Sequence, residues 1–458
     1  MSTRRISSVA HIGNTAIGGT NPIRIQSMTT TDTNDTEACV AQAKRIINAG
    51  GELVRLTTQG TREAENMKNI SARLKADGYN QPLVADVHFN AHVADVAAQY
   101  CEKVRINPGN YVDPARTFKR LEYTDVEYQE ELKKIDERLV PFINICKEHH
   151  SAVRIGVNHG SLSDRIMSRY GDTPAGIVES CMEFLRIFRR EQFDDVVISI
   201  KASNTVVMVQ SVRLLVEAMD KEDMHYPLHL GVTEAGEGED GRIKSAVGIG
   251  ALLTEGIGDT IRVSLSEEPE YEIPVARKIV DSIEECTRLR AQAEASIKDD
   301  TITLKIDETD WELFQLKAAM AVGALLIDRK ATHLVIASET PVNPDSLIAL
   351  ADAILQAARI KFTKTEYISC PGCGRTLYNL QDTIHRIKAA TSHLVGLKIG
   401  IMGCIVNGPG EMADADYGYV GAGRGKISLY RQKECVAKNI PEEEAVDRLL
   451  QLIEADKA

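Results

Sequence analysis

The sequence of 458 residues has no apolar run long enough to span a membrane, so a membrane-embedded protein is not expected. Its first residues, MSTRRISSVAHIGNT, include no apolar segment typical of a secretory signal, and we therefore expect a cytoplasmic location. The net charge of −12 argues against a general nucleic-acid-binding protein. The phosphate-binding patterns G-x-x-x-x-G-K-S/T and G-x-G-x-x-G are missing from the strand–helix junctions, which argues against a nucleotide cofactor.

A chain of this length suggests two or three domains. In its first 270 residues, β-rich segments alternate with stretches whose apolar residues recur at helical spacing. The eight β-rich segments are 23–29, 53–58, 83–89, 104–109, 152–158, 196–203, 228–235 and 260–266. This alternation predicts a parallel sheet, and eight strands predict a TIM (β/α)8 barrel. The charged stretch DVEYQEELKKIDERL, between the fourth and fifth strands, predicts an additional solvated helix.

Polar residues cluster at the ends of these strands with even spacing. Residues i and i+2 share one face of a strand, and barrel active sites form at the carboxyl ends of the strands. The pairs are Arg55 with Thr57, Asp86 with His88, Arg105 with Asn107, Arg154 with Asn158, Lys201 with Ser203, and Arg262 with Ser264. Five cations on five strands favour a polyanion site, because Arg side chains suit phosphate oxygens. The alternative is that some of them form salt bridges at the rim with Asp86 and Glu234.

The sequence contains nine cysteines, an odd number. Five of them stand singly in apolar or helical contexts, and we expect these to be buried as small hydrophobic residues. They are Cys39, Cys101, Cys146, Cys181 and Cys286.

The cysteines Cys370, Cys373 and Cys404 form a C-x-x-C pair followed by a third thiol in a glycine-rich loop. A zinc site would need a fourth ligand, for which Cys435 stays open. A thioredoxin-like redox pair would leave Cys404 unexplained. An iron–sulfur cluster could use all three thiolates, with the carboxylate of Glu411 as a further ligand. Glu411 is otherwise an ordinary surface or helix-capping carboxylate.

The motifs CPGCGRT and GCIVNGPGE, together with RIQSMT, ADVHFN, VRINPGN, VRIGVNHGSL, IKASN, GVTEAG and IRVSLS, resemble those of the 4-hydroxy-3-methylbut-2-enyl diphosphate synthase family. The resemblance covers residues 1–285 and 366–458. It implies a TIM barrel, followed by a C-terminal α+β iron–sulfur domain similar to sulfite and nitrite reductase modules. It also implies a [4Fe-4S] cluster held by Cys370, Cys373, Cys404 and Glu411.

The substrate implied by the resemblance is 2-C-methyl-D-erythritol 2,4-cyclodiphosphate, which is reductively opened with electrons from ferredoxin or flavodoxin. The substrate-binding positions would be Arg55, Arg105, Asn107, Arg154, Asn158, Lys201, Ser203, Thr233, Arg262 and Ser264. Asp86, His88 and Glu234 would handle the proton that leaves with the C3 oxygen. The alternative function is that of a non-redox, zinc-dependent phosphate-ester lyase or binding protein.

We expect three domains, a barrel over 1–285, a short α/β spacer over 286–365 and a cluster domain over 366–458. Some plant-like members of the family insert a large domain at the place of the spacer. Within the spacer, GALLIDRKATHLVIASETPVN parallels GALLTEGIGDTIRVSLSEEPE of the barrel, with Val335 in the place of Arg262. The spacer is therefore either a degenerate barrel fragment or a chance match of two βα units.

The length of the spacer permits capping of the barrel within one chain, but we expect a homodimer in which each cluster domain caps the partner's barrel. Mixed chains carrying Arg262→Ala and Cys373→Ser should then regain part of the activity. A basic patch near the cluster is expected to bind the acidic electron donor. Its candidates are Arg375, Lys398, Arg424, Lys426 and Arg431.

Overall fold

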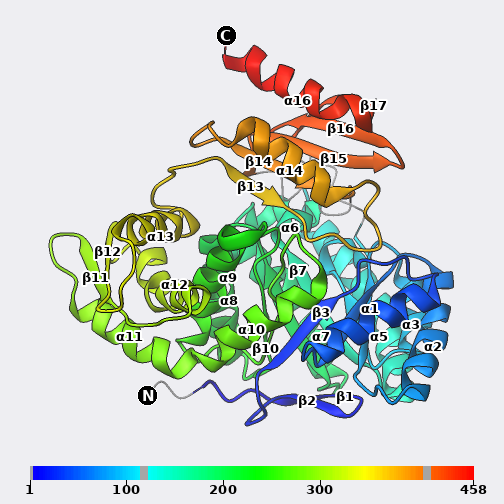
Figure 1. Cartoon of the computed structure of the whole chain (residues 1–458). Coiled ribbons are helices and arrows are strands. Elements are labelled where there is room, and N and C mark those ends of the chain that lie inside the picture. Colours follow the sequence, from blue (N-terminus) through cyan, green and yellow to red (C-terminus); the bar gives the residue numbers. More distant parts are fainter. Residues whose placement is uncertain (1–3, 114–121, 406–413, 458) are drawn as a thin grey trace.

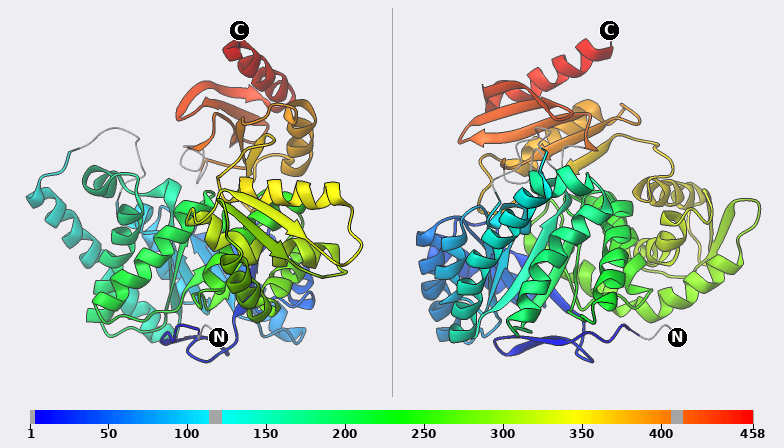
Figure 2. Two further views of the ribbon diagram at one scale, coloured as in Figure 1. Left: turned by 90° about the vertical axis from the view of Figure 1, so that its left-hand side faces the viewer. Right: turned by 180° about the vertical axis from the view of Figure 1, so that it is seen from behind.

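The structure is a computed structural model that describes residues 4–113, 122–405 and 414–457. Figure 1 shows a barrel of strands surrounded by helices, a smaller α/β layer beside it and a sheet domain above it. Two further views place the C-terminal domain over one end of the barrel and the N-terminus near the opposite end (Figure 2). Of the helices described, none is long and apolar enough to cross a membrane.

The described part of the chain contains eight parallel strands that close into a barrel in sequence order. β10 pairs with both β3 and β9, and a bridge between Ile198 and Leu228 joins β8 to β9. The strands are β3 (Arg24–Met28), β4 (Leu53–Thr58), β5 (Leu83–Val87), β6 (Lys103–Ile106), β7 (Ala152–Asn158), β8 (Val196–Lys201), β9 (His229–Leu230) and β10 (Thr260–Ile261). The predicted TIM barrel is confirmed, and each strand lies within or beside its predicted segment.

Helices cover the outside of this barrel (Figure 1). They are α1 (Thr36–Asn48), α2 (Thr61–Ala76), α3 (Ala91–Ala98), α4 (Pro108–Tyr111), α5 (Asp125–His149), α6 (Asp164–Tyr170), α7 (Pro174–Arg190), α8 (Thr205–Lys221), α9 (Gly238–Leu253) and α10 (Glu272–Asp281), with 3₁₀ turns at His159–Ser161 and Pro269–Tyr271. The predicted extra helix is α5, which begins at a capping box of Thr124 and Glu127. Asp35, Asn90 and Asn204 cap α1, α3 and α8 through their side chains.

An N-terminal hairpin that the sequence analysis did not predict packs against the barrel strands. It consists of β1 (Val9–Ile12) and β2 (Thr15–Gly18), which pair antiparallel. Its apolar side chains form one buried cluster with residues at the beginnings of the strands: Ala10, Ile12, Ile17, Leu53, Val84, Ala152 and Val197. The hairpin therefore closes the end of the barrel that lies opposite the strand ends expected to carry the site.

The middle segment is a folded α/β unit. It consists of α11 (Ile283–Ala295), β11 (Thr301–Lys305), α12 (Trp311–Ile327), β12 (His333–Ala337) and α13 (Pro344–Ala357), and β11 pairs parallel with β12. The domain boundary expected between residues 285 and 286 falls inside α11. The exact boundaries of the three domains stay predictions.

The two similar sequence stretches form similar structures, since α9 leads to β10 and α12 leads to β12. The two helices also pack against each other. A side chain at Gly323 would stand 2.7 Å from the carbonyl oxygen of Val247, so glycine permits the close approach. Val335, at the place of Arg262, is exposed on β12. The second copy therefore keeps the helix–strand pattern, but the position that corresponds to Arg262 faces solvent.

The C-terminal domain is an α+β layer with strand order β13-β14-β15-β16-β17. Its elements are β13 (Glu366–Ser369), α14 (Leu380–Thr391), β14 (Lys398–Met402), β15 (Tyr417–Gly423), β16 (Lys426–Arg431), β17 (Glu434–Pro441) and α16 (Glu442–Lys457). β13, β14 and β15 are parallel, so their carboxyl ends share one edge of the sheet. Cys370 follows β13 and Cys404 follows β14, which brings the three cysteines to that edge.

We predict that Gly323→Ala destabilises the contact between α9 and α12. The added methyl group would collide with the backbone of Val247, and overpacking of this kind costs about 1–3 kcal/mol. Urea unfolding followed by the fluorescence of Trp311, the one tryptophan of the sequence, reports on α12 directly. Gly423→Ala is the control, because its methyl group would meet only Lys426 Cβ, at 3.8 Å. Equal effects of the two changes would contradict the close helix contact.

Candidate active site

One chamber lies between the carboxyl ends of the barrel strands and the C-terminal domain. It holds about 720 Å³ of empty space, including the part open to solvent. Its described lining comes from both parts of the chain: Met28, Arg55, Asp86, His88, Arg105, Arg154, Asn158, Lys201, Thr233, Glu234, Arg262, Ser264, Cys370, Pro371, Gly372, Cys373, Arg375, Met402, Gly403 and Cys404. Most of the predicted strand-end residues and the three cysteines of the C-x-x-C…C pattern are therefore brought to one place.

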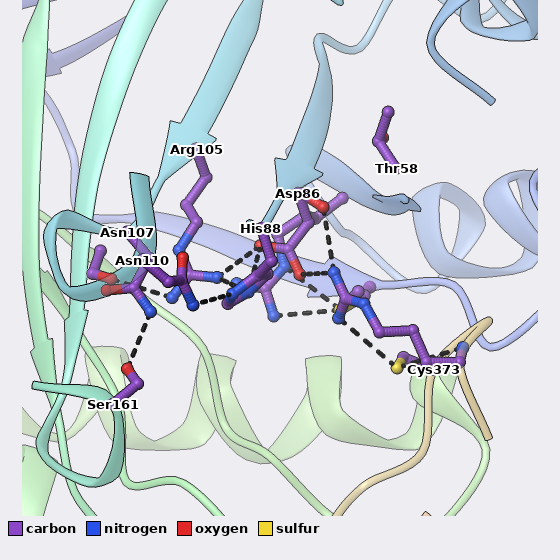
Figure 3. Close-up of polar contacts among 12 residues, drawn as sticks. Thr58, Asp86, His88, Arg105, Asn107, Asn110, Ser161 and Cys373 are labelled. Carbon is purple, nitrogen blue, oxygen red and sulfur yellow. Dashed lines mark hydrogen bonds and ion pairs between the residues drawn. The ribbon is translucent and has the colours of Figure 1, made fainter. Parts of the chain in front are cut away.

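Among the described residues, two of the five predicted cations have carboxylate partners. Arg105 donates from Nη1 to Asp86 Oδ1 at 2.9 Å and from Nη2 to the carbonyl oxygen of Gly156 at 2.9 Å (Figure 3). Arg262 forms two hydrogen bonds of 3.0 Å with Glu272, at Oε2 and Oε1. Glu272 begins α10 and was not predicted. The salt-bridge alternative is thus correct for these two arginines, and Glu272 rather than Glu234 is the partner of the second.

Arg154 lies deepest among these cations and is 1% exposed. Its Nε and Nη1 atoms have no hydrogen-bond partner in the described structure. Burial, followed by the charges of Arg55 and Arg105, holds the pKa of Arg154 well below its usual value. Burial and the neighbouring Arg154 also lower the pKa of Lys201 well below its usual value. An anion in the chamber would satisfy these groups and relieve their mutual repulsion.

Asp86 and His88 stand side by side with Arg105 (Figure 3). Burial alone would raise the pKa of Asp86, but the charges of Arg55, Arg105 and Arg375 outweigh it and hold this pKa well below the usual value. Burial, followed by the charges of Arg105 and Arg375, lowers the pKa of His88 well below its usual value. Arg105 donates to Nε2 of His88, which requires an unprotonated nitrogen there. Asp86 is therefore a carboxylate and His88 a neutral imidazole.

Glu234 differs from these two residues. It is 3% exposed, and its Oε2 atom has no hydrogen-bond partner among the described residues. Burial raises the pKa of Glu234 above its usual value. Its backbone is left-handed, with φ of 49°, and a bridge joins the next residue, Ala235, to Ser369 of the C-terminal domain. A buried carboxyl group with a raised pKa can hold a proton inside the chamber.

Asn107 and Ser203 are the two expected binding residues of the barrel that are not part of the chamber lining. Asn107 instead fixes the turn after β6: it accepts from the N–H of Gly109 and donates to Ser161 at 2.8 Å (Figure 3). Ser203 is buried just after β8. Asn158, Thr233 and Ser264 line the chamber as expected, and their substrate contacts stay predictions.

The thiols of Cys370, Cys373 and Cys404 face the same chamber. The N–H groups of Gly372 and Gly403 donate to Cys370 Sγ, each at 3.4 Å, as backbone donors do around iron–sulfur clusters. Burial, followed by the charge of Cys373, raises the pKa of Cys370, so that a bound metal is needed to keep it as a thiolate. These thiols and donors fit a cluster. Among the described residues, no three His, Cys, Asp or Glu side chains are placed to hold a single metal ion.

The fourth ligand predicted from the sequence, Glu411, lies outside the described residues. Cys435, the alternative fourth ligand for zinc, is on the edge strand β17, and its Sγ atom is 3.6 Å from the carbonyl oxygen of Ala437. It does not line the chamber. The structure thus does not support Cys435 as the fourth ligand. The five scattered cysteines, from Cys39 to Cys286, are buried as predicted.

The C-terminal domain caps the barrel of its own chain. Ser266 Oγ, in the segment after β10, donates to the carbonyl oxygen of Cys370 at 3.0 Å. Lys388 on α14 forms an ion pair of 2.8 Å with Glu237 at the start of α9. With the bridge from Ala235 to Ser369, these contacts join the C-terminal domain to the barrel of the same chain. The expected capping by a partner chain is therefore wrong for this structure.

The five residues of the proposed basic patch do not lie together on one surface. Arg375 is 7% exposed and paired with Asp86, so it cannot bind a protein on the surface. Lys398 begins β14, and Arg431 ends β16 and pairs with Asp456, both at the sheet edge opposite the cysteines. Only Arg424 and Lys426, exposed at the turn after β15, lie on the cysteine edge.

Comparisons with known proteins agree with this division of the chain. The family model described as the GcpE TIM-barrel domain matches residues 7–277, and that described as the GcpE protein C-terminal domain matches residues 366–455. A solved sialic acid synthetase from Leptospira borgpetersenii covers 62% of this chain and 90% of its own length, at 12% identity and a TM-score of 0.39. That likeness is too weak to carry an argument.

A curated protein from Phocaeicola vulgatus, named 4-hydroxy-3-methylbut-2-en-1-yl diphosphate synthase (flavodoxin), is 52% identical over 602 residues, which cover 99% of this chain and 98% of that protein. A protein of the same name from Akkermansia muciniphila is 42% identical over 566 residues, covering 98% and 96%. The 602 aligned positions exceed the 458 residues of this chain by 144. The Phocaeicola protein therefore has at least 144 residues without a counterpart here.

We predict that Arg154→Met improves stability and impairs binding of an anionic substrate. The change removes a buried charge that repels its cationic neighbours and has two unpartnered nitrogens in the described structure, so the thermal midpoint of the ligand-free protein should rise. A lost charge-assisted hydrogen bond is worth about 1.5–3 kcal/mol, so KM should increase about tenfold or more. Calorimetric unfolding and steady-state kinetics measure the two effects. A lower midpoint with normal KM would mean that Arg154 has a purely structural role.

We further predict that chains carrying Arg262→Ala and chains carrying Cys373→Ser do not restore each other's activity when mixed. Each chain builds its chamber from its own barrel and its own cap, so every chain in the mixture keeps one defect. The assay requires proof of subunit exchange, for instance by co-purification of differently tagged chains. Recovery of activity in the mixture would show that the caps act across chains.

Proposed function

The chain belongs to the GcpE family, and from that premise we propose that it catalyses the reductive opening of 2-C-methyl-D-erythritol 2,4-cyclodiphosphate to (E)-4-hydroxy-3-methylbut-2-enyl diphosphate. The observation that carries the proposal is the chamber itself. In the described structure it holds a buried arginine, two of whose nitrogens have no hydrogen-bond partner, together with three thiols that fit an iron–sulfur cluster. A cyclic diphosphate supplies the anion, and its reduction uses the cluster.

The reaction is a two-electron reduction. The bond from C2 to the phosphate oxygen breaks and opens the ring, and the C3 hydroxyl group leaves as water. Two electrons and one proton enter, the C2–C3 bond becomes a double bond, and the diphosphate dianion becomes a linear trianion. The protein therefore has to bind a substrate of growing negative charge and deliver a proton to the C3 oxygen.

The resident cofactor of this proposal is a [4Fe-4S] cluster held by Cys370, Cys373, Cys404 and Glu411. When bound, the cluster supplies the electrons and an iron that attracts an oxygen of the substrate. The N–H donors of Gly372 and Gly403 orient Cys370 for this role. Glu411 as an oxygen ligand rests on the motif GCIVNGPGE, seven residues after Cys404.

The diphosphate would lie against the barrel floor. Arg154 and Lys201 are the cations best suited to it, because burial and like charges disfavour their charged forms until an anion arrives. Arg55, Arg105 and Arg262 add positive charge, and Asn158, Thr233 and Ser264 add hydrogen-bond donors. Asn107 would act indirectly, by fixing the turn after β6.

Glu234 is the best candidate for the proton donor. It is the one of the three expected groups whose raised pKa favours a bound proton, whereas Asp86 is held ionised and His88 neutral. We assign Asp86 and His88 to the orientation of Arg105, which both contact. Loss of the C3 oxygen as water would take the proton from the carboxyl group of Glu234.

The electron donor would be a flavodoxin, as the names of the relatives indicate for those proteins. The acidic flavodoxin would approach the cysteine edge of the cap, where Arg424 and Lys426 are exposed. A cytoplasmic location and a homodimer stay predictions, and the chamber does not require a second chain. We also infer that the residues of the Phocaeicola protein without a counterpart here belong to the segment between the two family matches, which is 278–365 in this chain. The spacer of this chain would then be a shortened insert.

The proposed function predicts that anaerobically purified protein contains about four irons and four sulfides per chain. With reduced flavodoxin it should convert the cyclic diphosphate to the linear product. Colourless protein with one zinc per chain and no product would instead support the phosphate-ester lyase or binding protein.

Within this reaction, Glu234→Gln should lower kcat by about 10²–10⁴-fold and leave KM nearly unchanged, because a general acid is lost. In the wild type, activity should persist at acidic pH and decline as pH rises through the raised pKa, since the acid must be protonated. Glu239→Gln, an exposed change in the first turn of α9, is the control. Identical pH profiles for the wild type and Glu234→Gln would assign the proton to another group.

A further inference from the structure

The cap inserts one charged side chain into the barrel mouth, that of Arg375. Of the charged residues that line the chamber in the described structure, it alone comes from the C-terminal domain. It is 7% exposed. Its Nη2 atom donates to the carbonyl oxygen of Asp86 at 3.0 Å and to Asp86 Oδ2 at 3.1 Å. Arg375 therefore contacts both the backbone and the carboxylate of Asp86, which lies near the end of β5.

The loop that carries Arg375 is shaped to approach the barrel. The N–H of Cys373 donates to Thr376 Oγ1 at 3.1 Å, and the N–H of Thr376 donates to the carbonyl oxygen of Cys373 at 2.9 Å, which closes a tight turn. A side chain at Gly374 would stand 2.6 Å from the carbonyl oxygen of Thr31. Glycine thus lets the turn lie directly on the loop after β3 and directs Arg375 towards Asp86.

The carboxylate of Asp86 binds one arginine of the barrel and one arginine of the C-terminal domain. Its Oδ1 atom accepts from Arg105 of the barrel at 2.9 Å, while Oδ2 accepts from Arg375 of the cap at 3.1 Å. A buried carboxylate between two guanidinium groups is well compensated, and removal of either partner leaves charge uncompensated. The pair also spans a sequence separation of 289 residues, so it forms only when the cap sits on the barrel.

The other contacts of the cysteine loop with the barrel fix its opposite end. The bridge from Ala235 to Ser369 precedes the C-x-x-C motif, and Ser266 donates to the carbonyl oxygen of its first cysteine, Cys370. Arg375 follows the motif, so the barrel contacts the loop at both ends of the motif. Arg375 also contacts Cys373 Sγ, from its backbone N–H at 3.5 Å and from Nη1 at 3.8 Å.

We propose that Arg375 is a positioning residue that fixes the cysteine loop over the barrel by binding Asp86 and thereby sets the place of the cluster above the diphosphate. This role rests on the proposed function and deepens it. It differs from substrate binding, because the hydrogen bonds of Arg375 are made to Asp86 and Cys373. It also differs from donor docking, because the guanidinium group is buried.

The test is a double-mutant cycle of Arg375→Met and Asp86→Asn in the holoenzyme. Arg375→Met should lower kcat about a hundredfold, the effect of a misplacement of about 1 Å, while KM stays within about threefold because the barrel cations remain. If the two residues act as one unit, the double variant should be no worse than the poorer single variant. Arg375→Lys should restore part of kcat, since it returns the charge.

The midpoint reduction potential of the cluster is a second measurement, and it does not depend on turnover. Loss of a cation and a donor beside Cys373 should shift the midpoint potential of Arg375→Met to a more negative value, with iron and sulfide content unchanged. Arg375→Lys should shift it less. If the wild type makes no product, the proposed function fails, and the potential still tests the contact of Arg375 with Cys373.

Lys388→Met is the matched control, because Lys388 also joins the cap to the barrel but pairs with Glu237 outside the chamber. Its kcat should stay within about twofold of the wild type, as partly exposed ion pairs contribute little. Multiplicative losses of kcat in the cycle, or a rise in KM alone for Arg375→Met, would overturn the positioning role. An unchanged potential in Arg375→Met, or an equal loss of kcat in Lys388→Met, would also overturn it.

Discussion

Repulsion among buried cations at one end of the barrel is the constraint on which the rest of this structure depends. Six cationic side chains line the described chamber, whereas its lining includes two carboxylates and Glu272 lies just behind. Asp86 and Glu272 compensate Arg105, Arg375 and Arg262, but Arg154 has no partner for two of its nitrogens. The protein thus carries electrostatic strain that an anionic ligand relieves, at the expense of stability without it.

The cap and the barrel meet at charged residues, where a buried carboxylate attracts a cation of the cap. Asp86 needs cations on both sides, and one of them arrives with the cap as Arg375. Closure therefore gives Asp86 a second hydrogen-bonded cation and brings the three thiols into the same chamber as Arg154 in one step. The spacer makes this possible within one chain, because α12 packs on α9 and α13 leads directly to β13.

The sequence predicts the barrel well because each strand has a local signature, an apolar segment followed by polar residues at even spacing. It also predicts the chamber residues, since parity alone places Arg55, Arg105 and Arg154 inside. It does not reveal partners that are distant in the chain, such as Glu272 for Arg262 or Asp86 for Arg375. For the same reason Arg375 is mistaken for a surface residue. Capping within the chain depends on the packing of the spacer, which has no sequence signal.

The central claim is that each chain holds one complete, cation-lined chamber that awaits a diphosphate. Titration calorimetry of the oxidised holoenzyme with the cyclic diphosphate, without reductant, tests it most directly. The account predicts one ligand bound per chain, with an affinity that does not change when the protein is diluted. Binding of one ligand per two chains, loss of affinity on dilution, or no binding at all would contradict it.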